Sequence, residues 1–317
     1  MKKIEEISKK VKESIGQVFK GNPDILNMIL ASLFAGGHVL LEDVPGTGKT
    51  VLAKALAKTS GLDFSRVQCT PDLMPSDVTG SSVWIPSSQK FEYRPGPVIT
   101  SILLVDELNR ATPRTQSALL ECMAEGQISV DGQKHSLEKP FFVIATESPV
   151  ESEGTFPLPE AQKDRFMMCL SLGYPSADEE AQIITAQRSM QHPVEELSAV
   201  TNKEEVLECM EEASQIHVDE NLLAYLITLS KKTRDDLRIA AGVSPRGSIA
   251  LYKASQAYAA VNGRSFVTPE DIKHLALPVF RKRIILTSES NIKGYSAEHI
   301  LEELIESTPL PSFKAHL

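Results

Sequence analysis

Residues 46–50, Gly46-Thr47-Gly48-Lys49-Thr50, have the types and the spacing needed to bind phosphate. The apolar run 39–41 precedes them and an alanine-rich helical pattern follows, so they join a predicted strand to a predicted helix. Backbone N–H groups in such a turn, together with the helix N-terminus, bind polyphosphate anions. We expect Lys49 to reach the β- and γ-phosphates of a nucleotide and Thr50 to place its hydroxyl on Mg²⁺.

The predicted nucleotide-binding segment consists of Pro45, Gly46, Thr47, Gly48, Lys49, Thr50 and Val51. The full phosphate-loop pattern has glycine at position 43, where this chain has Asp43. Aspartate tolerates left-handed backbone better than most residues, so the turn can form without glycine. A carboxylate beside phosphates would weaken binding, but we expect nucleotide binding to persist.

Two carboxylates follow a second apolar run at residues 102–105. We expect Asp106 to hold Mg²⁺, mostly through water, and Glu107 to polarise an attacking water. The second role needs a carboxylate just beyond a rigid strand. An Asp-Glu pair after a strand is a weak signal by itself. Here it follows Lys49 by 57 residues, a spacing that favours placing both carboxylates at the same phosphate site.

These residues must be positioned by secondary structure, and the pattern around them alternates between short strands and helices. Strands are predicted at residues 39–41, 65–69, 102–105 and 141–145. Helices are predicted at 4–18 and 24–34, and two β-hairpins at about 82–93 and at 127–137, the second with Asp131-Gly132 at its turn. Buried strands that alternate with helices predict an α/β domain built on a parallel sheet.

After about residue 175 the strand signals stop and a series of helix starts follows. Helix N-caps are predicted at Ser176, Thr201, Ser244 and Thr268, the first two in capping boxes with Glu179 and Glu204 and the last two just before prolines. The sequence therefore predicts an α/β nucleotide-binding domain over residues 1–198 and an all-helical domain over residues 199–317.

Length and charge exclude several classes of protein. The 317 residues correspond to about two domains, and a net charge of −9 argues against a nucleic-acid-binding surface. The longest uncharged run, 25–41, is shorter than the roughly 20 residues of a membrane-spanning helix, so no membrane insertion is expected. The N-terminus lacks the pattern of a signal peptide, and the four cysteines lie at least 40 residues apart without metal or disulfide spacing. Buried thiols and a cytoplasmic location are expected.

Six segments together resemble the MoxR family of AAA+ ATPases: GHVLLEDVPGTGKT, DLMPSDVTG, LLVDELNRATPRTQSALLECMAEGQISVDG, PFFVIAT, EGTFPLPEAQKDRF and GVSPRG. They occur in the family's order and span most of the chain. The resemblance implies an AAA+ P-loop NTPase fold, in which a parallel sheet flanked by helices is followed by a C-terminal all-helical lid domain. It also implies Mg²⁺-dependent hydrolysis of ATP and a homo-oligomer, with a hexameric ring expected.

The resemblance assigns roles to further residues. Arg165, in the DRF motif, would act on the ATP of a neighbouring subunit, where a guanidinium can stabilise the charge of the transferred phosphoryl group. Arg246 matches the second sensor arginine, which would touch the γ-phosphate and couple the lid to the nucleotide state. Ser148 stands where the first sensor usually has asparagine. A serine hydroxyl reaches less far, so slow hydrolysis is expected, with Thr146 as a further contributor.

Other implied roles remain open. Either Gln68 or Thr70 could gate Glu107, and both could be purely structural. The two hairpins would line a central pore or contact partners, or they would pack on a neighbouring subunit. The roles of Asn109 and Arg110 could be interfacial or structural. Family members often act as chaperones on proteins with von Willebrand factor A domains, which implies a protein client of that kind.

A different class of function is an ATP-binding switch or scaffold with little turnover, which Asp43 and Ser148 favour. Turnover measured with and without a partner separates this alternative from a remodelling ATPase. Other classes fit less well. The nearest match to a guanine-binding motif, 202–205, lies in a predicted helix, no GAFTGA loop is present, and the net negative charge disfavours a role on DNA. A magnesium-chelatase ATPase subunit would share the fold and most of the site.

Overall fold

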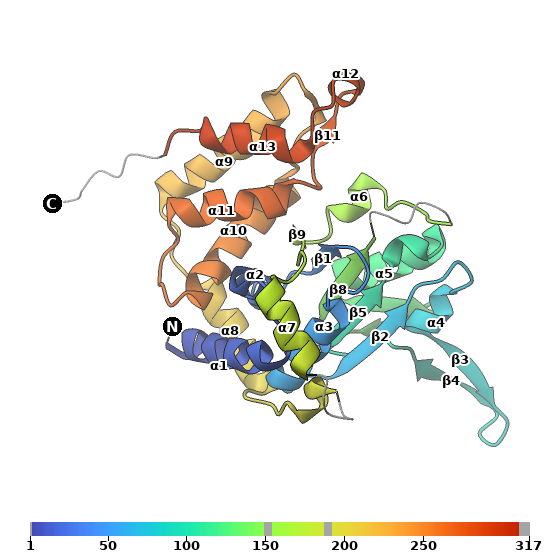
Figure 1. Cartoon of the computed structure of the whole chain (residues 1–317). Helices are drawn as coiled ribbons and strands as arrows, with labels where there is room; N and C mark the ends of the chain where they lie inside the picture. Colours follow the sequence, from blue (N-terminus) through green and yellow to red (C-terminus); the bar gives the residue numbers. More distant parts are fainter. Residues whose placement is uncertain (1, 149–153, 187–191, 311–317) are drawn as a thin grey trace.

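The computed structural model of the chain describes residues 2–148, 154–186 and 192–310. Figure 1 shows an α/β domain that contains a sheet, beside a helical domain formed by the C-terminal third of the chain. Within the described residues no helix is long and apolar enough to cross a membrane.

A five-stranded parallel sheet forms the centre of the α/β domain, with the order β2-β5-β8-β1-β9. The strands are β1 (Val39–Glu42), β2 (Phe64–Gln68), β5 (Ile102–Asp106), β8 (Phe142–Glu147) and β9 (Met168–Leu170). Four of them match the predicted strands. The fifth, β9, was not predicted, because it has only three residues and pairs with one neighbour at the edge of the sheet.

Helices cover both faces of the sheet, which explains why β5 is buried along its whole length. They are α1 (Lys2–Val18), α2 (Pro23–Phe34), α3 (Lys49–Ser60), α4 (Pro75–Thr79), α5 (Pro113–Glu125), α6 (Glu160–Lys163) and α7 (Ala177–Ala186), with 3₁₀ turns η1 (Leu108–Arg110) and η2 (Pro193–Glu196). Ile102 and Leu104 face the apolar core that contains α1 and α3, whereas Leu103 and Val105 face the core formed with α5. Successive strand residues thus supply opposite faces.

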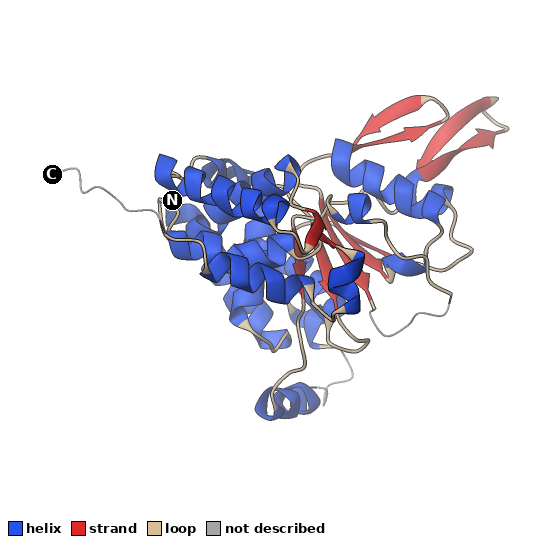
Figure 2. Cartoon of the chain, turned by 90° about the horizontal axis from the view of Figure 1, so that it is seen from above, coloured by secondary structure: helices blue, strands red, loops and turns tan. Residues whose placement is uncertain are grey.

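Both predicted hairpins are present, β3 (Gly80–Ile85) with β4 (Lys90–Pro95) and β6 (Gln127–Val130) with β7 (Gln133–Ser136). Figure 2 shows them projecting together from one side of the α/β domain. Asp131 and Gly132 have φ values of +49° and +76°, the left-handed pair that a tight hairpin turn requires. The rings of Tyr93 and His135 stack at 4.1 Å between centroids and join the two hairpins.

The helical domain consists of α8 (Lys203–Ser214), α9 (Glu220–Asp235), α10 (Pro245–Val261), α11 (Pro269–Phe280), α12 (Ser288–Ile292) and α13 (Ala297–Glu306). It also contains a short antiparallel pair, β10 (Ile239–Ala241) with β11 (Ile285–Leu286), that no strand signal predicted. The N-caps Ser244 and Thr268 and the Ser176 capping box are confirmed. The predicted cap at Thr201 is wrong by one residue: the Asn202 side chain caps α8 by accepting from the Glu205 N–H.

One apolar core crosses the predicted boundary at residue 198. Ile4 and Ile15 of α1, Leu30 of α2 and Leu251 and Ala254 of α10 belong to the same buried cluster. Helices α1 and α2 therefore pack on the helical domain as well as on the sheet. The division into residues 1–198 and 199–317 stays a prediction, since secondary structure changes near it but packing continues across it.

Candidate nucleotide-binding site

The glycine-rich loop runs from the carboxyl end of β1 to the first turn of α3. Gly46 and Gly48 both have φ of +88°, which side chains other than glycine rarely adopt. Gly48 is the N-cap of α3 and supplies no side-chain hydrogen bond, so the first amides of the helix keep their capacity to bind an anion. A Cβ added at Gly46 would meet nothing within 4 Å. Backbone conformation and open space together fit a phosphate cradle.

Lys49 extends into this loop. Its ammonium donates to the backbone carbonyls of Asp43 at 2.8 Å and of Val44 at 3.1 Å. Burial lowers the pKa of Lys49, and the charges of Asp43, Asp106 and Glu107 oppose that shift. The structure therefore brings the predicted lysine and the two predicted carboxylates into one electrostatic environment.

Asp43 directs its carboxylate toward the segment that follows β9. Its Oδ1 accepts from the Ser171 hydroxyl at 2.7 Å and the Gly173 N–H at 3.1 Å, and its Oδ2 accepts from the Leu172 N–H at 2.7 Å. The side chain is buried. The carboxylate expected beside the phosphates is thus engaged by three donors, and it ties the start of the loop to the edge of the sheet.

An apolar cavity of about 180 Å³ adjoins the loop. Its walls include Gly48 and Val51 from the loop and α3, Phe19 from the α1–α2 connection, and Leu172 and Ile183 from the region after β9. Aromatic and aliphatic walls beside a phosphate cradle suit a flat nucleobase. Of the predicted segment, Gly46, Thr47, Gly48 and Val51 line this cavity, and Pro45 is exposed beside it.

Asp106 ends β5 and is buried. Its Oδ2 accepts from Arg66 Nε at 2.6 Å, and the Arg66 Nη2 group donates to Gln68 Oε1 at 2.9 Å. Arg66 is a site residue that the sequence analysis missed. Alternation along β2 offered a signal, because Gln68 pairs in register with Asp106 and Arg66 lies two residues earlier on the same face. Thr70 instead forms a hydrogen bond with Asp72.

Glu107 adopts left-handed backbone, with φ of 55° and ψ of 51°. Its N–H donates to Thr146 Oγ1 at 2.8 Å, and its carboxylate accepts from Arg110 Nη1 at 3.1 Å. Such backbone strain in a residue other than glycine persists only where surrounding contacts impose it, and it concentrates at functional sites. Thr146 Oγ1 also donates to Asp106 Oδ1 at 3.5 Å, so this hydroxyl connects the backbone of Glu107 to the carboxylate of Asp106.

Ser148 follows β8 and is buried, and its hydroxyl has no hydrogen-bond partner among the described residues. Residue 149, which ends the predicted sensor segment, lies outside the described residues. This buried hydroxyl therefore has unused hydrogen-bonding capacity among the described residues.

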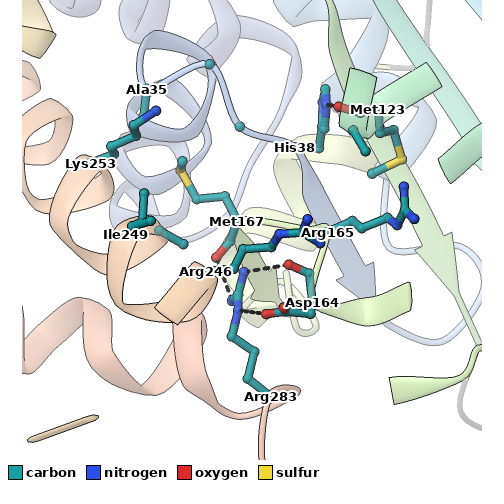
Figure 3. A pocket seen from close by; sticks show the side chains of 14 residues that line it. Ala35, His38, Met123, Asp164, Arg165, Met167, Arg246, Ile249, Lys253 and Arg283 are labelled. Carbon is teal, nitrogen blue, oxygen red and sulfur yellow. Dashed lines mark hydrogen bonds and ion pairs between the residues drawn. The ribbon is translucent and has the colours of Figure 1, made fainter. Parts of the chain in front are cut away.

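Arg165 and Arg246 lie together at the other end of the sheet. They line a cavity of about 280 Å³ with Gly37 and His38, which precede β1, and Figure 3 shows both side chains there. The phosphate loop follows the carboxyl end of β1, so the four residues of that strand, roughly 13 Å at 3.3 Å per residue, separate the two places. Arg165 Nη1 donates to the Leu120 carbonyl at 2.7 Å, while its buried Nε has no partner among the described residues.

Comparison with known proteins agrees with this geometry. Residues 38–168 match the ATPase family associated with various cellular activities (AAA), and residues 231–304 match the AAA lid domain. The chain is 48% identical to the uncharacterized protein YeaC of Bacillus subtilis, over 95% of this chain and 94% of that protein. It is 35% identical to the chaperone MoxR1 of Mycobacterium tuberculosis, over 95% and 81%. A crystal structure of a proposed ATPase from Cytophaga hutchinsonii superposes with a TM-score of 0.90 at 37% identity, covering 98% of this chain and 96% of that one.

The loop between β1 and α3, the carboxylates that follow β5 and the two matched regions define an AAA+ protein with a nucleotide-binding domain and a lid. Two similarities identify the family within this class. They are the identity to MoxR1 along nearly the whole chain and the 30% identity to the protein MoxR of Paracoccus denitrificans. The chain belongs to the MoxR family.

Proposed function

We propose that the protein binds ATP with Mg²⁺ at the loop between β1 and α3, hydrolyses the ATP and uses the energy to remodel partner proteins. The observation that carries the proposal is the placement of Glu107. Glu107 stands one residue beyond β5 on strained backbone; Thr146 accepts from its backbone N–H, and Arg110 donates to its carboxylate. A rigidly held carboxylate beside a phosphate cradle is what activation of water requires.

In this proposal different residues of the chain bind the phosphates, the base and the metal. The loop amides and Lys49 bind the phosphates, and the cavity beside Val51 receives the base. Thr50 and Asp106 offer the hydroxyl and carboxylate oxygens that suit Mg²⁺, which when bound neutralises charge on the phosphates. Asp106 Oδ2 is paired with Arg66, so a cation held at this oxygen would compete with the Arg66 guanidinium. Glu107 accepts the proton of the attacking water, and the Ser148 hydroxyl, which has no partner among the described residues, orients the γ-phosphate or the water.

Arg165 and Arg246 complete the site of a neighbouring subunit in this proposal. Their cavity at the amino end of β1 is separate from the loop of their own chain, and the buried Arg165 Nε has no partner among the described residues. The working form is therefore a homo-oligomeric ring, for which six subunits are expected from the family. Both arginines would stabilise the charge of the transferred phosphoryl group.

The client is a protein, and a von Willebrand factor A-domain protein remains the expected kind. Support comes from the chaperone name of MoxR1 and from the projecting β3–β4 hairpin, on which Trp84 and Phe91 pack against each other while 48% and 70% exposed. Exposed aromatic pairs on a protruding element suit contact with another protein. A cytoplasmic location stays a prediction, supported by four buried, free cysteines.

The test combines light scattering after size-exclusion chromatography with phosphate release, without nucleotide, with ADP, and with ATP plus Mg²⁺. We expect ATP to drive assembly and turnover. Glu107→Gln should keep ATP bound and stop turnover, while Glu13→Gln on the exposed face of α1 should change neither. Turnover of Glu107→Gln at the wild-type rate would contradict the assignment of the catalytic carboxylate.

An ATP-binding switch with little turnover is the second candidate. Two observations favour it: Ser148 is shorter than the usual asparagine, and Arg66 occupies an oxygen of Asp106. Assembly driven by ATP, with negligible phosphate release even when a client is present, would establish the switch and overturn the remodelling ATPase.

A further inference from the structure

We propose that Arg283, in the lid, is a positioning residue that holds Arg165 and Arg246 in one fixed unit for use by the neighbouring subunit. This inference rests on the proposed function, because it assumes that the two arginines act on a neighbour's nucleotide. Arg283 lies between α11 and β11, and its side chain is only 4% exposed. Such burial of a guanidinium is costly unless its donors are satisfied and its charge is paired.

All five N–H donors of Arg283 find acceptors. Nε donates to Asp164 Oδ1 at 2.7 Å, Nη1 donates to the Met167 carbonyl at 3.1 Å, and Nη2 donates to the Asp164 carbonyl at 3.2 Å. The remaining two donors bind the carbonyls of Phe166 and Val279. Three of these carbonyls belong to residues that flank Arg165 in the chain. Arg283 thus fixes the backbone on both sides of Arg165 (Figure 3).

Asp164 extends the unit to Arg246. While Oδ1 of its carboxylate binds Arg283, its Oδ2 accepts from the Ser244 hydroxyl at 3.1 Å. Ser244 is the N-cap of α10 and accepts from the Gly247 N–H at 3.3 Å, so Arg246 lies in the turn that this cap closes. One carboxylate therefore connects the segment of Arg165, the helix start that carries Arg246, and the buried guanidinium of the lid.

Little space separates Gly247 from the Arg283 side chain. A Cβ added at this position would stand 2.8 Å from Arg283 Cδ and 2.6 Å from the Val243 side chain, which is shorter than real Cβ contacts. The glycine of the SPRG segment thus leaves room for the arginine, and the serine of the same segment binds the carboxylate that pairs with it. Ser244 and Gly247 thus both have a contact in the unit formed around Arg283, while Arg246 between them is directed to the cavity.

The experiment uses two kinds of full-length subunit that are each expected to be inactive alone. Recipient subunits carry Arg165→Ala with an intact phosphate loop, and donor subunits carry Lys49→Ala with Arg165 intact. If Arg165 acts on a neighbour's nucleotide, mixing them restores ATP turnover. Failure of this mixture to turn over ATP would overturn the proposed role of Arg165 itself, independently of Arg283.

The donor subunit is then given Arg283→Lys as a second substitution. Lysine keeps the charge but offers three donors to five acceptors. We expect turnover of the mixture to fall at least tenfold with KM within twofold of the reference mixture, because KM is set by the recipient's own loop. Arg264→Lys in the donor is the matched control. This substitution weakens the ion pair between Arg264 and Asp271, which lies in the lid beyond the C-terminal end of α10. ATP turnover of the mixture should therefore be restored as fully as with the reference donor.

Equal restoration by the Arg283→Lys donor and the control donor would overturn the inference. So would a rise in KM with unchanged maximal turnover, which indicates general loosening of the assembly. Incorporation of each donor is measured by light scattering on the same mixtures. If the Arg283→Lys donor does not assemble, Gly247→Ala replaces it, since it displaces Arg283 without removing a donor. Full restoration by Gly247→Ala would likewise contradict the role.

Discussion

Acidification should destabilise the protein through His38, a buried residue that precedes β1. Its Nδ1 accepts from the Val143 N–H at 3.1 Å, and its Nε2 lies 3.1 Å from the Met123 carbonyl, so the neutral ring carries its proton on Nε2. Burial lowers the pKa of His38 from 6.5 to about 4. Protonation would add a charge in an enclosed place and would place a second N–H against the Val143 donor.

The direction and size of the stability change follow from the difference in the pKa of His38 between the folded and the unfolded chain. Below pH 6.5 the unfolded chain takes up a proton at this histidine, while the folded chain resists until about pH 4, so the stability is lost as the pH falls between these values. The full gap corresponds to roughly 3.4 kcal/mol. Between pH 7.5 and pH 5.5 the loss from His38 alone is about 1.3 kcal/mol.

The assay is urea unfolding of the nucleotide-free protein, followed by circular dichroism at a series of pH values. His38→Gln is the comparison variant, because an amide can accept from Val143 and donate to Met123 but does not titrate. Subtracting its pH profile removes the contribution of every other titrating group. We expect the free energy of unfolding to fall more steeply in the wild type, by about 1.3 kcal/mol over this range. Parallel profiles would refute the reasoning.

Three further predictions concern the nucleotide site. Lys49→Ala should weaken ATP binding about a hundredfold in calorimetry, because a charge-assisted contact to the phosphates is lost; unchanged affinity would refute the assignment of the loop. Arg66→Gln should lower the Mg²⁺ concentration for half-maximal ATP binding by roughly threefold, while Arg66→Lys should not. The effect is modest because Arg66 is 46% exposed and its ion pair is partly screened. Ser148→Asn should raise turnover about tenfold by restoring the longer reach of the first sensor. An unchanged turnover number would show that Ser148 does not limit hydrolysis.

The parts of the site that could be predicted from sequence are those whose residues are neighbours in the chain. The loop 46–50 and the pair Asp106-Glu107 acquire their geometry from the strand and helix beside them, so local pattern was sufficient. The hairpin turn at Asp131-Gly132 is of the same kind. Apolar strands with strong patterns were recognised for the same reason.

Contacts between residues far apart in the chain could not be predicted in this way. Arg66 and Asp106 are 40 residues apart, Arg283 and Asp164 are 119 apart, and Asp43 binds a segment about 130 residues later. Nothing local distinguishes such arginines and aspartates from surface residues. The misplaced cap at Thr201 has another cause, because Thr201 and Asn202 can both cap a helix and only tertiary packing selects between them.

The apolar core that runs from α1 and α2 into α10 has a mechanical consequence. The lid shares its core with the first two helices and is fastened to the α/β domain through Arg283, so within the described residues it is braced against swinging as a separate body. If the protein acts as the proposed ring, the motion driven by ATP would be rotation of each whole subunit against its neighbour. The flexible parts of such an assembly would lie at the interfaces between subunits.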